Sequence, residues 1–286
     1  MQGRTDLALE QKEEIADLPP GVECDEIKKG DTIITKITIK NEKGAAALKK
    51  PIGKYTTIEV PPFTDNINDE ELIKIGAEEL TELIPKKGPA LIVGLGNRQI
   101  TPDALGPKSA SKILATGHIG VELKRVASLE KIEDVFVLSP GVLGQTGIEV
   151  FDLLSALTRE IKPKFLIVID ALASRNVCRL GCTLQMSDTG IEPGAGVGNA
   201  RREISQKTLG VPVIAMGVPT VVDAKTLVYD LTGKVSDTIN PYGRQMIVTP
   251  REIDLLIDRA ANLIAQSVNR ALHPTIDPEI INELLA

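Results

Sequence analysis

The order of apolar and polar positions predicts strands that alternate with helices over most of the chain. Short apolar runs rich in Ile, Val and Leu are separated by segments whose apolar residues recur at helical spacing. The predicted strands cover residues 90–93, 135–138, 165–170 and 211–216, and the predicted helices cover residues 104–115, 147–161 and 221–231. Strand and helix in turn predict an α/β fold, with a mainly parallel sheet flanked by helices on both faces.

Two earlier segments, residues 31–40 and 55–60, are rich in β-branched residues and predict an N-terminal antiparallel β extension. Two prolines at residues 61–62 end it. We therefore expect a single α/β domain over residues 7–286, made of a β-rich extension at residues 7–62 and an α/β core at residues 63–286.

Two further helices have recognisable starts. Asn68 with Glu71 predicts a capped helix over about residues 69–84. The Thr-Pro-Arg-Glu stretch at residues 249–252 predicts the start of another helix, with apolar side chains on one face. Both helices have the pattern of structural elements that cover a sheet.

The composition narrows the classes of function. The chain has 286 residues, a net charge of −6 and 2% aromatic residues, so basic and stacking surfaces for nucleic acid are disfavoured. It has no apolar stretch long enough to span a bilayer and no apolar signal region, which predicts a cytoplasmic protein without a membrane partner. Three cysteines suit a reducing compartment, and Cys178 with Cys182 lack the further ligands of a zinc site.

The most informative local pattern is the turn that follows the apolar run at residues 90–93. It contains Gly94 and Gly96 and leads to a carboxylate at Asp103. A dinucleotide-binding fingerprint needs a third glycine where Gln99 stands, so this turn does not indicate a nucleotide site. For Asp103 the alternative to a catalytic role is that it caps the helix that begins beside it.

A second carboxylate, Asp170, ends the apolar run at residues 165–169. Because the carboxyl ends of parallel strands meet at one edge of a sheet, we expect Asp103 and Asp170 to form one site. Asp170 abuts so apolar a strand that it is poorly solvated unless it faces a cleft or a partner. Two carboxyl groups can act as acid and base in hydrolysis, and the alternative is that they bind a divalent metal that activates water.

A glycine-rich stretch at residues 181–200 follows the second acid. Thr183, Leu184 and Met186 suggest a short hairpin within it. The remainder suits a flexible flap or an oligomer contact as well as a catalytic loop.

Four segments together resemble the spore germination protease family. They are Gly-Leu-Gly-Asn-Arg with Thr-Pro-Asp-Ala-Leu-Gly-Pro within residues 94–107, Ser-Pro-Gly-Val-Leu-Gly-Gln-Thr-Gly-Ile-Glu at 139–149, Val-Ile-Asp-Ala-Leu-Ala-Ser-Arg at 168–175, and Arg-Thr-Asp-Leu-Ala-Leu-Glu at 4–10. The similarity covers essentially the whole chain. Members of this family are endopeptidases that start the breakdown of the small acid-soluble proteins coating DNA in dormant spores of Bacillus and Clostridium relatives.

The resemblance implies roles for particular residues. Asp103 and Asp170 stand where the family has its proposed catalytic acids. The family is made as an inactive homotetrameric zymogen in the spore, which implies small acid-soluble spore proteins as substrates and location in the spore core. Its fold resembles that of hydrogenase maturation peptidases, which add a histidine that has no evident match here. We expect no cofactor, and participation of a metal stays open.

The N-terminus resembles a substrate of the same family. Family substrates are cut after the acid in Thr-Glu-Phe/Ile-Ala-Ser-Glu sequences, and residues 5–10, Thr-Asp-Leu-Ala-Leu-Glu, have the same layout. We therefore predict self-cleavage between Asp6 and Leu7, which removes residues 1–6 as a propeptide. The alternative is an ordinary frayed terminus.

An acidic chain that binds acidic substrate segments needs local basic groups. Arg98, beside the glycine turn, and Arg175, just beyond Asp170, are the predicted substrate-binding residues, because guanidinium pairs well with carboxylate. Structural ion pairs are the alternative for both arginines. Three functions stay open at this point: a self-processing endopeptidase, a metal-assisted hydrolase of another small substrate, and a non-enzymatic binder of acid-soluble spore proteins.

Overall fold

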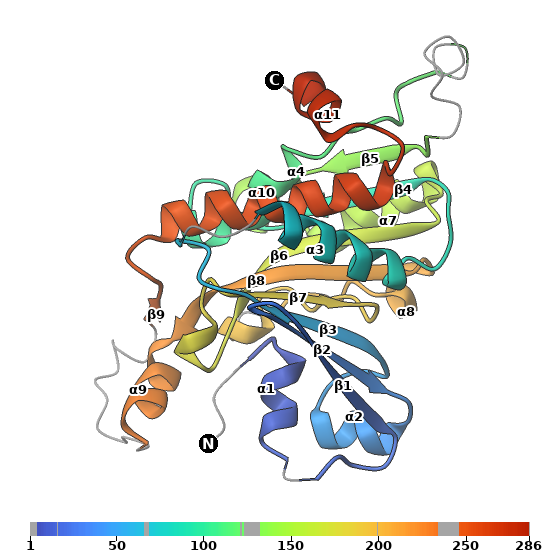
Figure 1. Ribbon diagram of the computed structural model, residues 1–286. Helices are drawn as coiled ribbons and strands as arrows, with labels where there is room; N and C mark the ends of the chain where they lie inside the picture. Colours follow the sequence, from blue (N-terminus) through green and yellow to red (C-terminus); the bar gives the residue numbers. More distant parts are fainter. Residues whose placement is uncertain are drawn as a thin grey trace.

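A single mixed sheet runs through the computed structural model, which describes residues 5–15, 17–65, 69–120, 122, 132–198, 200–233 and 246–285 (Figure 1). Its strands follow the order β1-β2-β3-β7-β8-β6-β4-β5, and β9 pairs with β8. The strands are β1 (Val22–Lys29), β2 (Thr32–Ile39), β3 (Gly53–Glu59), β4 (Ala90–Gly94), β5 (Val135–Leu138), β6 (Phe165–Ala173), β7 (Thr183–Ser187), β8 (Val213–Asp223) and β9 (Ile247–Val248).

The two halves of the sheet differ in strand direction. Strands β5, β4, β6 and β8 are parallel, whereas β1, β2, β3 and β7 are antiparallel to their neighbours. The predicted α/β class and the antiparallel N-terminal extension are confirmed. The extension continues the core sheet, because β7 joins β3 to β8.

Two details of the predicted strands were wrong. Residues 183–186 form no local hairpin, since β7 pairs with β3 and β8, which lie far from it in sequence. Strand β8 continues past the Gly217–Pro219 stretch that was expected to end it, because it pairs with β6 through this stretch. A register shift after Leu172 accommodates the proline, which has no N–H to donate to the ladder.

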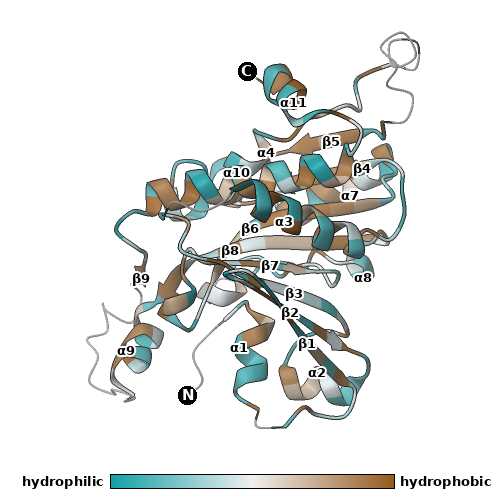
Figure 2. Ribbon diagram, viewed as in Figure 1, coloured by the Kyte–Doolittle hydropathy of each residue, from teal (hydrophilic) through white to brown (hydrophobic). Residues whose placement is uncertain are grey.

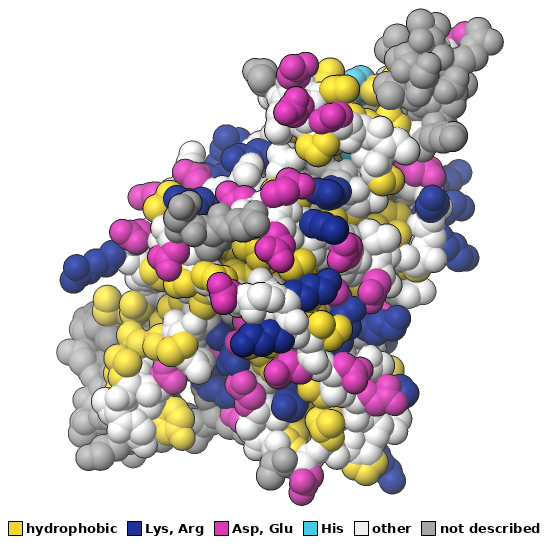
Figure 3. Space-filling model, viewed as in Figure 1, with side chains coloured by type: hydrophobic (Ala, Val, Ile, Leu, Met, Phe, Trp, Pro, Cys, Tyr) yellow, Lys and Arg dark blue, Asp and Glu magenta, His cyan; other side chains and the backbone are white. Residues whose placement is uncertain are grey.

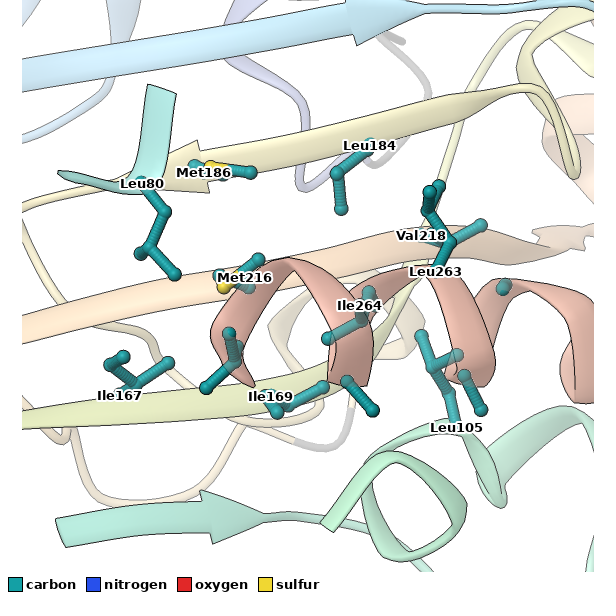
Figure 4. Packing of buried hydrophobic residues seen from close by; sticks show 14 of the residues in the cluster. Leu80, Leu105, Ile167, Ile169, Leu184, Met186, Met216, Val218, Leu263 and Ile264 are labelled. Atoms are coloured by element: carbon teal, nitrogen blue, oxygen red, sulfur yellow. The ribbon is translucent and has the colours of Figure 1, made fainter. Parts of the chain in front are cut away.

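Helices cover both faces of the parallel half. One face carries α3 (Asp69–Leu83), α4 (Leu105–Ala110) and α10 (Ile253–Leu272), and the other carries α7 (Val150–Ile161) and α8 (Gln206–Leu209). Figure 2 shows the strands mostly hydrophobic and α3 and α10 polar on their outer sides. In Figure 4, Leu80 of α3 and Ile264 of α10 pack with Ile169 of β6 and Met216 of β8. Alternate residues of β6 therefore enter two separate cores.

The N-terminal part contains elements that the sequence did not predict. Strand β1 and helix α2 (Glu42–Leu48) flank the two expected strands, and helix α1 (Ala8–Glu13) packs with them. Their shared cluster includes Ala8, Ile37, Leu48 and Tyr55. This places the chain's first helix beside the sheet rather than free in solvent.

The remaining helices are short or lie at the edges of the molecule. They are η1 (Thr101–Asp103), α6 (Leu143–Thr146), η2 (Val177–Arg179), η3 (Ala195–Val197), α9 (Ala224–Thr232) and α11 (Pro278–Leu285). Helix α3 begins at the expected residue, although the cap residue Asn68 lies outside the described residues. Helix α10 begins at Ile253, a few residues later than the start predicted at Thr249 and Pro250, and Glu252 is its N-cap. No helix in the described ranges is both long and apolar enough to cross a membrane. Figure 3 shows acidic and basic side chains interspersed over the face in view.

Candidate active site

The carboxyl ends of β4 and β6 bring the two predicted acids together. Asp170 is the sixth residue of β6, and Asp103 ends the η1 turn that follows β4. Strands β4 and β6 are adjacent and parallel, with Gly94 opposite Ile169. The expected meeting of the two acids at one edge of the sheet is therefore seen in the structure.

Glycines in the turn after β4 allow its backbone to approach the backbone of residues 103–106 closely. A Cβ on Gly94 would lie 2.2 Å from the carbonyl oxygen of Gly106, and a Cβ on Gly96 would lie 2.0 Å from that of Asp103. Gly96 also has a φ of +111°, a region that favours glycine. Gly106 packs in turn against the carbonyl oxygens of Leu95 and Ile169. The glycine-rich turn thus packs the Asp103 segment against the ends of two strands.

Asp103 does not cap the helix beside it. The N-cap of α4 is Ala104, without a side-chain hydrogen bond, and the Asp103 carboxylate instead accepts the N–H of Asn97 at 2.7 Å. Asn97 also accepts a hydrogen bond from Gln145 at 2.9 Å, which joins the glycine turn to the 139–149 segment. The capping alternative is wrong, because the carboxylate turns back toward the loop.

Burial perturbs both carboxyl groups. Asp170 is 7% exposed, and burial raises its pKa well above the usual range, with further increases from the charges of Asp103 and Asp6. The hydrogen bond from the N–H of Ala171 opposes this rise. Burial also raises the pKa of Asp103, against the hydrogen bond from Asn97. Such a pair favours a state with one shared proton, which is what acid–base catalysis needs.

The N-terminal segment lies in the same region rather than frayed. Leu7 is 0% exposed, and its N–H donates to Thr5 Oγ1 at 3.0 Å, so the backbone turns at this point. The N–H of Asp6 donates to the carbonyl oxygen of Ala173 at 2.9 Å, and the N–H of Ala173 donates to Asp6 Oδ2 at 2.8 Å. The bond between Asp6 and Leu7 therefore lies beside the end of β6.

A cleft of about 620 Å³ lies next to this segment. Its floor is the sheet face that also carries Asp170, since Asp170, Gly217 and Gln185 are directly opposite one another on β6, β8 and β7. Asp6 and Lys50 border the cleft, together with the loop at residues 189–196.

The two predicted substrate-binding arginines occupy different settings. Arg98 is exposed in the turn that follows Gly94 and Gly96. Arg175 forms an ion pair with Glu14, and its Nη2 donates to the carbonyl oxygen of Glu10 at 2.6 Å. The structural ion pair that the sequence left open for Arg175 is thus present, and a role of either arginine in substrate binding stays a prediction.

Several groups near the predicted cut were not found from the sequence. Lys50 Nζ donates to the carbonyl oxygen of Asp6 at 2.8 Å, and the N–H of Gly196 donates to the Asp6 carboxylate. Lys50 lies just after α2, in a segment to which no function was assigned from the sequence. The glycine richness of residues 181–200 was the one available sign of Gly196, and it did not distinguish a site from a flap.

Among the residues that it describes, the structure gives no sign of a metal site at the cysteines that the sequence singled out. Cys178 and Cys182 are free thiols, and burial raises the pKa of Cys182 to about 11. In the described ranges, three or more His, Cys, Asp or Glu side chains do not gather in the arrangement of a metal site.

Taken with the fold, the site defines an α/β protein with a buried acid and a half-buried acid at adjacent strand ends, an arrangement suited to acid–base hydrolysis. A family model described as germination protease matches residues 4–234 and 232–284. The chain belongs to the germination protease family. It is accordingly a peptide-bond hydrolase, a protease of spore germination, and the non-enzymatic alternative is wrong.

Relatives of known name agree over nearly the whole length. The germination protease of Clostridium tetani (strain Massachusetts / E88) is 42% identical over 323 residues, which cover 100% of both chains. That of Bacillus velezensis (strain DSM 23117 / BGSC 10A6 / LMG 26770 / FZB42) is 35% identical over 350 residues, covering 96% of this chain and 95% of the relative.

Among solved structures, the chain is similar to the [NiFe] hydrogenase maturation protease HycI from Thermococcus kodakarensis KOD1. The match has a TM-score of 0.36 and 17% identity, and it covers 66% of this chain and 98% of the other.

Proposed function

We propose that the chain is a self-processing endopeptidase zymogen that starts the degradation of small acid-soluble spore proteins. Asp103 and Asp170 are its catalytic acids. The observation that carries the proposal is the position of the substrate-like segment: the bond between Asp6 and Leu7 lies beside β6, close enough for Asp6 to raise the pKa of Asp170. Cleavage of this bond removes residues 1–6.

The proposed reaction moves one proton through the pair. Asp170 holds the shared proton, because it is the more perturbed of the two acids. Asp103 takes a proton from a water molecule while the water oxygen bonds to the carbonyl carbon of the scissile peptide. Asp170 gives its proton to the leaving nitrogen, and the C–N bond breaks. The pair ends with the proton on Asp103, and exchange with solvent restores the starting state.

Substrates present the same features as the N-terminal segment. An acid precedes the cut, a hydroxyl residue precedes the acid, and apolar residues follow. In this chain Thr5 stabilises the turn at the cut, and Leu7 and Ala8 are both buried. We also propose, from the family resemblance, that the protein is a homotetramer and acts in the cytoplasm of the spore.

Intact-mass spectrometry of the purified full chain tests the proposal. We expect the wild-type protein to lose residues 1–6 and to cut a small acid-soluble spore protein after Thr-Glu. Asp103→Asn and Asp170→Asn should each slow both reactions by about 10²–10⁴-fold while remaining folded. Normal cleavage by both variants would rule out the acid pair.

Two conditions in the same experiment sharpen the mechanism. A lower pH fills the one-proton state of the pair, so we expect faster self-processing at pH 5.5 than at pH 7.5, and a flat rate would contradict this dependence. Processing that stops on addition of EDTA and returns with a divalent cation would instead favour the metal-assisted mechanism.

A further inference from the structure

Asp6, the residue before the predicted cut, is bound through its backbone N–H, its carboxylate and its carbonyl oxygen. The backbone of Asp6 pairs with Ala173 at the end of β6, and its carboxylate accepts two backbone N–H groups, from Ala173 and from Gly196. Its carbonyl oxygen accepts a third hydrogen bond, from Lys50 Nζ at 2.8 Å. Side chain and scissile carbonyl are therefore bound by separate groups.

The space for the carboxylate depends on glycine at position 196. A Cβ there would lie 2.2 Å from Asp6 Oδ2 and 2.8 Å from the Cβ of Ala173. The φ of Gly196 is outside the left-handed region, so the backbone does not require glycine there. What the glycine provides is room for two oxygen atoms against the N–H groups.

The N–H groups of Ala173 and Gly196 suit the carboxylate of an Asp or Glu side chain better than the amide of Asn or Gln. A carboxylate has only acceptors, whereas an Asn or Gln side chain would turn its NH₂ group toward one of the N–H donors. Burial lowers the pKa of Lys50, and the charges of Asp6, Glu10 and Glu192, which face it, oppose that change and favour its ammonium form. Burial raises the pKa of Asp6 and the charge of Glu10 adds to this, whereas the hydrogen bonds from Ala173 and Gly196 and the charge of Lys50 oppose the rise.

Lys50 binds the carbonyl oxygen of Asp6 rather than its carboxylate. Its ammonium group contacts the oxygen of the carbonyl that is attacked, where negative charge grows during hydrolysis. The backbone N–H of Lys50 donates to the carbonyl oxygen of Ala45 at 3.2 Å, at the end of helix α2. The N-terminal extension therefore contributes a charged group to a site whose acids come from the core.

We propose that Ala173, Gly196 and Lys50 form the subsite for the acidic residue that precedes the scissile bond. The N–H groups of Ala173 and Gly196 select a carboxylate, and Lys50 is a catalytic residue that stabilises the carbonyl oxygen. The same subsite takes the acid of a protein substrate once residues 1–6 have left. This inference rests on the proposed cleavage between Asp6 and Leu7.

The first test changes the ligand and leaves the subsite intact. Full-length Asp6→Glu, Asp6→Asn and Asp6→Ala chains are incubated, and the rate of loss of residues 1–6 is followed by intact mass. We expect Asp6→Glu to process and Asp6→Asn to process about 10–100-fold more slowly than wild type, as for a lost hydrogen bond to a charged group. Equal rates for wild type and Asp6→Asn would overturn the subsite.

The second test changes the subsite. Gly196→Ala should slow processing and, after processing, reduce the preference for a Thr-Glu peptide over its Thr-Gln counterpart, mainly through KM. Lys50→Met should lower kcat by about 10²-fold with little change in KM, and Lys50→Arg should recover part of it. The matched controls are Gly120→Ala, where an added Cβ meets no atom within 4 Å, and Lys43→Met, on the exposed side of α2.

The outcomes separate this inference from the function on which it rests. If wild type cuts nothing and keeps residues 1–6, the proposed protease mechanism fails. If wild type processes but Gly196→Ala keeps the Glu preference and Lys50→Met keeps kcat, only the subsite is wrong. Thermal unfolding checks that each variant is folded, and the Asp6 series decides the matter if Gly196→Ala does not fold.

Discussion

Glu10 and Asp170 are two buried carboxylates at the same segment, residues 170–176: Asp170 belongs to it, and Glu10 accepts hydrogen bonds from it. The two differ in the charges and hydrogen-bond donors that surround them. Glu10 of helix α1 is 0% exposed and accepts the N–H groups of Arg175 and Asn176, with Arg179 at 3.5 Å. Asp170 is 7% exposed, and among the residues that the structure describes its carboxylate accepts a hydrogen bond from the N–H of Ala171 alone, while Asp103 and Asp6 lie near it.

The difference separates a structural acid from a reactive one. Buried charge is tolerated when hydrogen bonds and an opposite charge replace water, as they do around Glu10. Asp170 lacks that compensation, so its charged form is disfavoured and its pKa rises well above the usual range. A buried acid is therefore informative about function only when its partners are known, and those partners come from distant parts of the chain.

Replacing Glu10 by Ala should give the largest change in stability. The variant leaves the backbone N–H groups of Arg175 and Asn176 without their buried acceptor, which costs about 1–3 kcal/mol for each group, whereas Arg179 keeps its ion pair with Glu13. Urea unfolding followed by circular dichroism measures the loss. Glu14→Ala is the control, because Glu14 pairs with Arg175 nearer the surface and should cost about 0–1 kcal/mol. Similar losses for the two variants would remove the contrast.

Replacing Asp170 by Asn should stabilise the protein while abolishing cleavage. A raised carboxyl pKa gives stability that is complete below the unfolded pKa and is lost as pH rises through the folded pKa. The neutral amide avoids that loss, so we expect the Tm of Asp170→Asn to exceed that of wild type by about 2–4 °C near pH 8. The difference should shrink toward pH 4. A lower Tm for the variant at pH 8 would contradict the assignment of Asp170 as uncompensated.

Replacing Arg175 or Arg98 should give the smallest changes in stability. Arg175→Ala should cost about 0–1 kcal/mol, because its ion pair with Glu14 is partly exposed. Arg98→Ala should leave the free energy of unfolding unchanged, since Arg98 is exposed. If either arginine binds substrate, its variant will raise KM for an acidic peptide more than for a neutral one. Unchanged KM for both would leave recognition of the acid to the Ala173, Gly196 and Lys50 subsite.

Much of the core could be predicted from local patterns. The apolar runs predicted the four parallel strands, because strands buried on both faces are continuously apolar. Strand β5 has the predicted bounds, residues 135–138. Strand β1 was missed because its polar residues, such as Glu23, Asp25 and Glu26, hide the strand pattern. The place of β7 was also missed, because alternation marks a strand without naming its partners.

The sequence by itself determined where the two acids lie, since each follows a continuously apolar run that forms a parallel strand, and the carboxyl ends of adjacent parallel strands meet at one edge of the sheet. It also determined the substrate-like order of residues 5–10. Only the tertiary structure decided what surrounds them: Lys50 comes from the extension, Gly196 from a distant loop and Asp6 from the first residues described. Local sequence fixes backbone conformation and burial, whereas the charge environment of a buried group depends on contacts between segments far apart in the chain.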